Sequence, residues 1–154
     1  MIVLVCGLPG AGKTTLAKLL APAISAVHFD GDDVREMFGH HKFDMHSRII
    51  QAGRMGWLCG KVHDAGHAVV ASFVCPTHTT RAYFGRADYV IWVDRISSCQ
   101  YEDTNDIFEK PRYDLRLVDG TPQEWLEWAI AGLSSAGLTV ARGLQPALYV
   151  GGHR

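Results

Sequence analysis

The residues best suited to chemistry lie close to the start of the chain, where an apolar run meets a glycine-rich turn. Residues 2–6 are followed by the pattern G-x-x-x-x-G-K-T, which ends at Lys13 and Thr14. Glycines at this spacing let the backbone curl so that several N–H groups face one phosphate. The lysine ammonium can bridge the β- and γ-phosphates of ATP, and the threonine hydroxyl can bind Mg²⁺. The pattern therefore predicts a phosphate-binding loop that takes ATP and Mg²⁺ as cofactors. The residues expected to contact the nucleotide are Gly7, Leu8, Pro9, Gly10, Ala11, Gly12, Lys13, Thr14 and Thr15.

Two carboxylates and an arginine follow the second apolar run of the chain. Asp30 and Asp32 come directly after this run, and Arg35 lies one helical turn beyond Asp32. The carboxyl ends of parallel strands border the ligand crevice of an α/β sheet, so both carboxylates should lie beside the γ-phosphate. One of them can bind Mg²⁺, and the other can accept the proton of an attacking hydroxyl. We expect Asp30 and Thr14 to hold Mg²⁺. The predicted catalytic residues are Lys13, Asp32 and Arg35. The alternative is that these acids only mark the positive end of a helix.

Arginines also lie where we expect the rim of the crevice. Arg48 is near the start of a long helical stretch, and Arg81 lies in the next one. Paired planar donors suit sulfate, phosphate or a DNA backbone. The residues predicted to bind the acceptor are therefore Arg35, Arg48, Ser72, Phe73 and Arg81. The alternative for Arg48 and Arg81 is a solvated position on a helix.

Strand and helix patterns alternate along the chain and should position these residues. The predicted strands are 2–6, 26–29, 67–73, 89–93 and 113–118, and the predicted helices are 13–21, 32–38, about 47–65, about 79–84 and 122–135. Continuous apolar strands are typical of parallel sheets covered on both faces. Together the elements predict one α/β domain over residues 1–154, with the P-loop NTPase fold: a doubly wound, mainly parallel, five-stranded sheet with helices on both faces.

Two segments are less regular. Gly53, Gly56 and Gly60 lie on roughly one face of the long helix, where each costs about 1 kcal/mol relative to alanine. This face either packs closely, most simply on the sheet, or leaves clearance for an acceptor, or the helix is interrupted. In the tail, residues 138–154, the stretch 146–150 is a candidate extra strand.

Composition limits the class of protein. The 154 residues are 47% apolar and 20% charged, with a net charge of −1. No signal peptide, membrane span or overall basic character is evident, so we expect a cytoplasmic protein. The widely spaced cysteines read as buried, reduced thiols, and the eight histidines form no set with ligand spacing.

The two motifs together resemble the adenylylsulfate (APS) kinase family. Its members carry G-L-x-G-[AS]-G-K-[ST]-T and later D-G-D-N-x-R, and residues 64–73 are similar to its D-A-G-x-x-x-x-x-S-F strand. The resemblance covers about residues 2–118 and implies kinase chemistry. The chain departs from it at Asp33, where the family has Asn, and at residues 101–106, which replace a lysine-rich substrate lid. The family's N-terminal extension also has no counterpart here.

The stretch around Asp32 and Arg35 is also similar to phage polynucleotide kinase, which has R-D-D-Y-R there. Short APS-kinase-like proteins occur in phages, where some relatives phosphorylate hydroxymethyl pyrimidines during DNA modification. We therefore expect an ATP-dependent kinase that phosphorylates a hydroxyl of an anionic, nucleotide-like acceptor. The alternatives are a kinase acting on a hydroxymethyluracil-type base or another DNA hydroxyl, and a nucleotide-regulated binding module without turnover. Neither the acceptor nor the oligomeric state follows from the residues.

Overall fold

The computed structural model describes residues 1–138, and within them the strands form one parallel sheet. Its order is β2-β3-β1-β4-β5, so the chain crosses over the sheet in both directions from β1. The strand bounds are β1 Ile2–Cys6, β2 Val27–Asp30, β3 Val69–Ser72, β4 Tyr89–Val93 and β5 Leu115–Leu117. The predicted five-stranded P-loop architecture is confirmed, because switching direction beside β1 is what makes such a sheet doubly wound.

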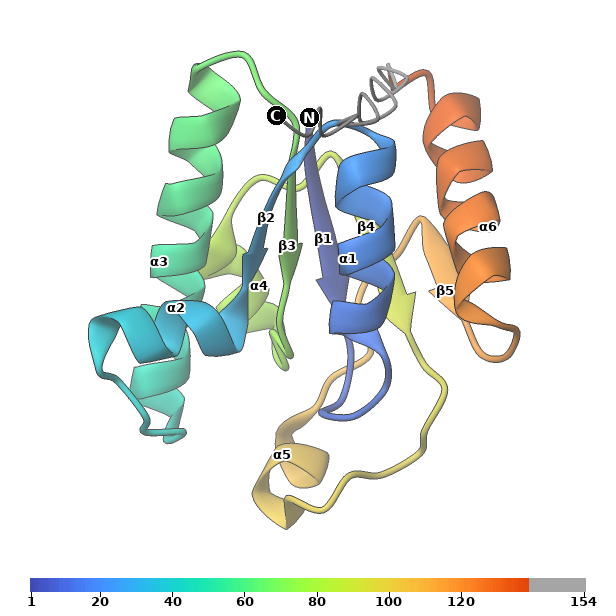
Figure 1. The fold of residues 1–154 in the computed structure, drawn as a ribbon. Helices are drawn as coiled ribbons and strands as arrows, with labels where there is room; N and C mark the ends of the chain where they lie inside the picture. The colour runs from blue at the N-terminus through green and yellow to red at the C-terminus, as the bar shows by residue number, and fades with distance from the viewer. Residues whose placement is uncertain (139–154) are drawn as a thin grey trace, which may run out of the picture.

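Helices cover both faces of the sheet (Figure 1). Helices α1 and α6 lie side by side on one face, and α3 and α4 pack together on the other. The helix bounds are α1 Lys13–Ala23, α2 Gly31–Phe38, α3 Met45–Asp64, α4 His78–Phe84, α5 Glu102–Ile107 and α6 Pro122–Ser135. The phosphate-binding loop, α2 and α5 all lie toward the end of the sheet opposite the chain's N-terminus.

Each face of the sheet has its own hydrophobic core. The α1/α6 core contains Val3, Val5 and Leu16 together with Trp125 and Leu133, whose helical spacing led us to expect burial. On the α3/α4 face, buried side chains of β1 and β3 pack on α3. A strand that is apolar on both faces, such as β1, is held between these two layers, which fixes where the loop after it emerges.

Sequence signals placed the starts of the predicted helices within two residues of their positions in the structure. Helix α6 begins with the predicted capping box, in which the Thr121 side chain accepts from the Glu124 backbone and Pro122 occupies the first turn. Helix α3 begins two residues earlier than expected, because the Asp44 side chain caps it by accepting from the Ser47 N–H. Strand β3 begins later than expected, at Val69, because Gly66 has a φ of 89° and ends the preceding helix.

The long helix α3 is continuous through its three glycines. A Cβ at Gly56 would overlap the Phe84 carbonyl oxygen at the end of α4, whereas Gly53 and Gly60 have open space beside them. Our simplest expectation, that these glycines pack on the sheet, is therefore wrong. The close approach is between α3 and α4, and it requires glycine at one position of the three. The possible strand at 146–150 lies outside the described residues.

Candidate active site

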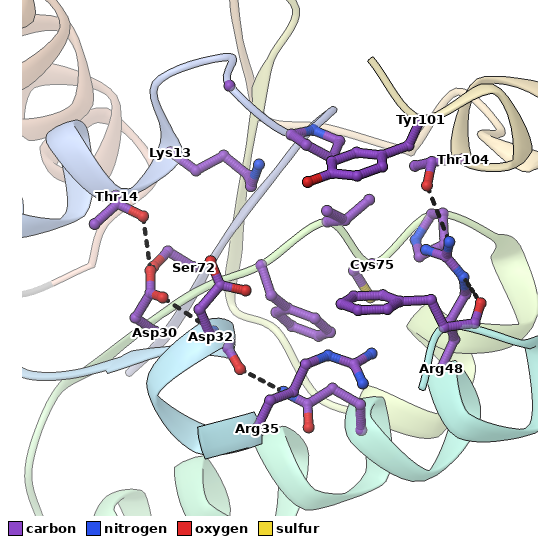
Figure 2. A pocket seen from close by; sticks show the side chains of 18 of the residues that line it. Lys13, Thr14, Asp30, Asp32, Arg35, Arg48, Ser72, Cys75, Tyr101 and Thr104 are labelled. Carbon is purple, nitrogen blue, oxygen red and sulfur yellow. Dashed lines mark hydrogen bonds between the residues drawn. The ribbon is translucent and has the colours of Figure 1, made fainter. Parts of the chain in front are cut away.

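A cavity of about 810 Å³ opens at the carboxyl end of the sheet. One side of it is formed by the phosphate-binding loop and the start of α1, and the other by α2, α3, the end of β3 and the segment around α5 (Figure 2). The lining residues are Pro9, Gly10, Gly12, Lys13, Thr14, Thr15, Asp30, Gly31, Asp32, Arg35, Phe43, Arg48, Gln51, Ser72, Phe73, Val74, Cys75, Pro76, Gln100, Tyr101, Asp103 and Thr104. The cavity thus brings together both sequence motifs and most of the predicted acceptor residues.

The loop between β1 and α1 has the backbone shape that the glycines predict. Gly7, Gly10 and Gly12 have φ values of 152°, 80° and 110°, which side chains other than hydrogen rarely allow. A Cβ at Gly7 would also overlap the Val93 carbonyl oxygen of β4. Since α1 begins immediately after Gly12, its free N–H groups and positive dipole end face the cavity.

Lys13, the first residue of α1, is a charged side chain that is nearly buried. Its ammonium donates to the Leu8 carbonyl oxygen at 2.8 Å, and only 9% of the residue is exposed. Burial lowers the pKa of Lys13 to about 8, and the nearby carboxylates of Asp30 and Asp32 offset this only in part. The ammonium therefore lacks a full counter-charge, which is the state in which it gains most from bound phosphate.

Asp30 lies at the end of β2 and accepts three hydrogen bonds. Its Oδ2 accepts from the Thr14 hydroxyl at 2.7 Å and from the Ser72 hydroxyl at 2.8 Å, and its Oδ1 accepts from the Asp32 N–H at 3.0 Å. Burial alone would raise the pKa of Asp30, but these hydrogen bonds outweigh it, and the net pKa lies below its usual value. Asp30 is thus held as a carboxylate beside a hydroxyl, a pair of oxygen donors that fits Mg²⁺.

Asp32 occupies the first turn of α2 and is exposed to the cavity rather than paired. Only its backbone N–H is used locally, in the bond to Asp30. Its carboxylate is therefore available to a molecule in the cavity, next to the oxygens of Thr14 and Asp30.

Arg35 and Arg48 both lie beside the ring of Phe43, on the side of the cavity away from the phosphate-binding loop. The two guanidinium carbons lie 4.3 and 5.6 Å from the ring centre. Arg35 also donates to the carbonyl oxygens of His40 and Lys42, so it fixes the loop between α2 and α3. Both arginines are less than a tenth exposed, and both line the cavity as predicted.

The segment around α5 closes this side through Arg48. One nitrogen of the Arg48 guanidinium donates to the Asp103 carboxylate at 3.2 Å and to the Thr104 hydroxyl at 2.9 Å. Helix α5 itself was missed by sequence reasoning. It has six residues, and Tyr101 at its N-cap makes no side-chain cap hydrogen bond, so the start signal that reveals other helices is absent.

Gln51 is a second residue that sequence reasoning missed. Its amide nitrogen donates to the Gly31 carbonyl oxygen at 2.8 Å, while its Oε1 is buried and finds no partner among the described residues. It lies one turn after Arg48 on the same face of α3 and lines the cavity. A buried acceptor left unpaired is costly, so a donor group on a bound molecule would be favoured there. That one-turn spacing after Arg48 was the available signal.

Ser72 and Phe73 reach the cavity from the end of β3, but Arg81 does not. Arg81 donates to the carbonyl oxygens of Cys75, Pro76 and Glu109, and so ties the segment after β3 to the segment after α5. Its place outside the lining makes it a support for the cavity wall, in contrast to the acceptor contact expected from its position after a strand.

The cysteines are mostly buried and reduced, as expected. Burial raises the pKa of Cys6 to about 11 and of Cys59 and Cys75 to about 12, whereas Cys99 is partly exposed. Among residues 1–138 no group of three or more His, Cys, Asp or Glu side chains is placed to hold a metal ion. In the same part of the chain, no helix is both long and apolar enough to cross a membrane.

The geometry agrees with comparisons to known proteins. Residues 1–124 match the family model described as adenylylsulphate kinase, and the chain therefore belongs to the adenylylsulphate kinase family of P-loop kinases. It is similar to the adenylyl-sulfate kinase of Aeromonas hydrophila, with 32% identity over 73% of this chain and 63% of that protein. It is also similar to the cytidine diphosphoramidate kinase of Campylobacter jejuni, with 30% identity over 47% of this chain and 46% of that protein. The chain thus spans between about half and two thirds of these relatives' length.

Solved structures show the same fold. An APS kinase of Mycobacterium tuberculosis, in complex with AMPPNP and APS, matches with a TM-score of 0.74 and 20% identity over 86% of this chain and 96% of that one. Shikimate kinase from Aquifex aeolicus matches with a TM-score of 0.61 and 14% identity over 89% and 98% of the two chains.

Proposed function

We propose that this protein is an ATP-dependent kinase that transfers the γ-phosphoryl group to a hydroxyl of a nucleotide-like, anionic acceptor. The observation that carries the proposal is one cavity with two distinct ends. Lys13, Thr14 and the glycine-rich loop line one end, and Phe43 and Arg48 line the other. Asp32 lies between them, where a reacting hydroxyl would have to sit.

The phosphate end supplies positive charge and a metal site. Lys13 has no full counter-charge and would neutralise the charge that grows on the transferring phosphoryl group. The oxygens of Thr14 and Asp30 converge within hydrogen-bond distance and would hold Mg²⁺. When bound, Mg²⁺ neutralises phosphate charge during transfer.

Asp32 is the group we assign to the acceptor hydroxyl. Its side chain is exposed at the cavity and its neighbour Asp30 is already engaged by three donors, so the two carboxylates have separate tasks. Asp32 would orient the hydroxyl and accept its proton, while Asp30 keeps the metal. Arg35 holds the neighbouring loop and adds positive charge near the reacting groups.

The acceptor end suits a planar base attached to an anion. The Phe43 ring offers an aromatic face, Arg48 offers a guanidinium, and the Gln51 Oε1 needs a hydrogen-bond donor. An amino-bearing nucleobase with a sulfate or phosphate group satisfies all three. The matches to an adenylyl-sulfate kinase and a cytidine diphosphoramidate kinase support a nucleotide of this kind.

A DNA acceptor is less favoured by the charges at the rim. The exposed residues Glu102, Asp103 and Asp106 of α5 put carboxylates where a DNA backbone would have to pass. Small nucleotides can enter beneath this rim, whereas a polymer cannot avoid it.

Labelled ATP tests the proposal directly. We would offer it with APS, a cytidine nucleotide, hydroxymethyluracil-containing DNA, or water alone, and separate the products. Label on either small nucleotide is the expected result. Label on DNA would support the alternative acceptor, and ATP binding without transfer to any acceptor or water would leave a binding module.

We also propose that Arg95 contributes to binding the adenine of ATP. The Arg95 guanidinium is exposed, stacks 4.6 Å from the Trp125 ring centre and donates to the Ala11 carbonyl oxygen beside the phosphate loop. A flat cation at this place offers a stacking surface for the base of ATP. This shelf lies outside the acceptor cavity lining, so the two bases would not compete.

A further inference from the structure

His28 belongs to neither of the two motifs. It is nevertheless connected to Asp30, the carboxylate assigned to Mg²⁺, through a hydrogen bond to Ser72. It lies in the middle of β2, two residues before Asp30, so both side chains project from the same face of the sheet. Ser72 of β3 is the register partner of Asp30. The Ser72 hydroxyl oxygen lies 2.7 Å from the His28 Nε2 and 2.8 Å from the Asp30 Oδ2.

The directions of these bonds follow from the donors available. A serine hydroxyl has one hydrogen, and the ionised Asp30 can only accept, so Ser72 must donate to Asp30. The remaining bond then requires His28 to donate from Nε2 to the Ser72 oxygen. Ser72 is 1% exposed, which leaves little room for water to replace the imidazole.

The result is a chain of hydrogen bonds that ends on the carboxylate of Asp30, which we assign to Mg²⁺. His28 donates to Ser72, Ser72 donates to Asp30, and Thr14 donates to the same Asp30 oxygen. Without the imidazole the Ser72 hydroxyl could rotate, and Asp30 would lose one of three donors that fix its orientation. A carboxylate free to turn is a weaker metal ligand.

We propose that His28 is a positioning residue for Mg²⁺ binding, acting through Ser72 on Asp30. The proposal rests on the proposed function only in giving Asp30 and Thr14 to the metal. It predicts a defined tautomer, with hydrogen on Nε2, and a coupling between His28 and Ser72 that vanishes when either is removed.

The decisive experiment is a double-mutant cycle on metal binding. Mg²⁺ would be titrated calorimetrically into the protein saturated with ADP, for wild type, His28→Phe, Ser72→Ala and the double variant. Each single substitution should weaken Mg²⁺ binding by roughly tenfold, the size typical of groups that orient metal ligands. The double variant should be no weaker than the weaker single one, because His28 acts only through Ser72.

Two further variants separate positioning from packing. In His28→Gln the amide nitrogen can replace Nε2 as donor to Ser72, so Mg²⁺ affinity should stay within about threefold of wild type on the scale of such effects. His67→Phe removes an exposed histidine that precedes the neighbouring strand β3 and should leave Mg²⁺ affinity unchanged. Melting temperatures of all variants report whether each one folds.

The outcomes distinguish this inference from the kinase proposal. Additive losses in the double variant, unchanged Mg²⁺ affinity in His28→Phe, or a nitrogen NMR spectrum showing hydrogen on Nδ1 instead of Nε2 would each overturn the role of His28. Coupled losses of Mg²⁺ affinity in a protein that transfers no phosphoryl group would support the role of His28 and overturn the proposed reaction alone.

Discussion

Lys13 shows how one buried charge links the fold to nucleotide binding. Burial lowers its pKa to about 8, and the protonated form is the one that binds phosphate. As the pH rises through 8 the free enzyme loses this charge. We therefore predict that kcat/KM for ATP falls above pH 8, by about tenfold per pH unit once Lys13 is mostly neutral. A pH profile measured with a saturating acceptor checks this.

Two variants complete that test. Lys13→Arg keeps its charge over the whole range, so its kcat/KM for ATP should be lower but flat above pH 8. Lys13→Ala should lose roughly 10²-fold or more in turnover, because the electrostatic contribution to phosphoryl transfer is large. A wild-type profile that stays level to pH 10 would show that phosphate binding does not depend on the Lys13 charge.

The division of work between Asp30 and Asp32 gives a second prediction. Asp32→Asn keeps the shape of the side chain and removes the proton acceptor, so kcat should fall by roughly 10²- to 10⁴-fold while ATP affinity is retained. Asp30→Asn, the matched change two residues earlier, should instead raise the Mg²⁺ concentration needed for half-maximal rate. If Asp32→Asn lost ATP affinity and kept the chemical step, the roles of the two carboxylates would be reversed.

Among single residues, those at or near a strand end were easier to predict than those within helices, although Arg35 and Arg48 also line the cavity as predicted. Asp30 ends β2 and Lys13 follows the short loop after β1, and the carboxyl ends of parallel strands lie at the same edge of the sheet. Gln51 lies one turn after Arg48 in α3, and this spacing does not by itself show that its side chain packs against Gly31 and is buried. Arg81 also lies within a helix, α4, and carbonyl oxygens from two loops hold it outside the cavity.

At the scale of elements, the contact between α3 and α4 depends on a single glycine. A Cβ at Gly56 would overlap the backbone of Phe84, whereas one at Gly53 would meet open space. Gly56→Ala should therefore lower the free energy of unfolding by about 1–3 kcal/mol. Gly53→Ala should raise it by about 0.5–1 kcal/mol, through better helix propensity. Chemical denaturation of both variants checks the pair, and equal effects of the same sign would contradict the close approach.

The strands and capped helices could be read from the sequence because their signals are local. The apolar run of β1 and the capping box of α6 need no knowledge of neighbouring elements. Helix α5 has neither a side-chain cap nor a long periodic pattern. It is stabilised by a hydrogen bond from Arg48, which lies more than fifty residues earlier in the chain, to Asp103. Its existence is a tertiary effect, and so is the shape of the acceptor end of the cavity.

Helix α5 also affects acceptor binding, because one of its carboxylates pairs with Arg48. Asp103 is 68% exposed and pairs with the buried Arg48, the guanidinium we assign to the acceptor's anion. The acceptor must therefore displace or share this carboxylate. Asp103→Asn should lower the KM of an anionic acceptor by about two- to fivefold, the size of an exposed ion pair, without changing KM for ATP. Asp106→Asn makes the same charge change on the same helix and should have little effect. An equal decrease in both variants would point to general electrostatics.

At the scale of the whole molecule, the distribution of charge bears on whether the acceptor is a small nucleotide or a DNA strand. The net charge is −1, and the cavity lining combines Lys13, Arg35 and Arg48 with Asp30 and Asp32, while further carboxylates lie on the exposed side of α5. A nucleotide enclosed in the cavity is shielded from added salt, whereas a DNA strand crossing the rim would release counterions with each phosphate contact.

Salt dependence turns this arrangement into a test. Between 50 and 200 mM salt, we predict that kcat/KM for a small nucleotide acceptor falls by less than about tenfold, since few exposed charges are paired. A DNA acceptor with four phosphate contacts should instead lose roughly 50- to 150-fold. KM for ATP, measured in the same titration, corrects for effects at the phosphate end. A steep loss seen only on the acceptor side would favour the polymer, and it would require α5 to move away from Arg48 so that the rim no longer faces the substrate.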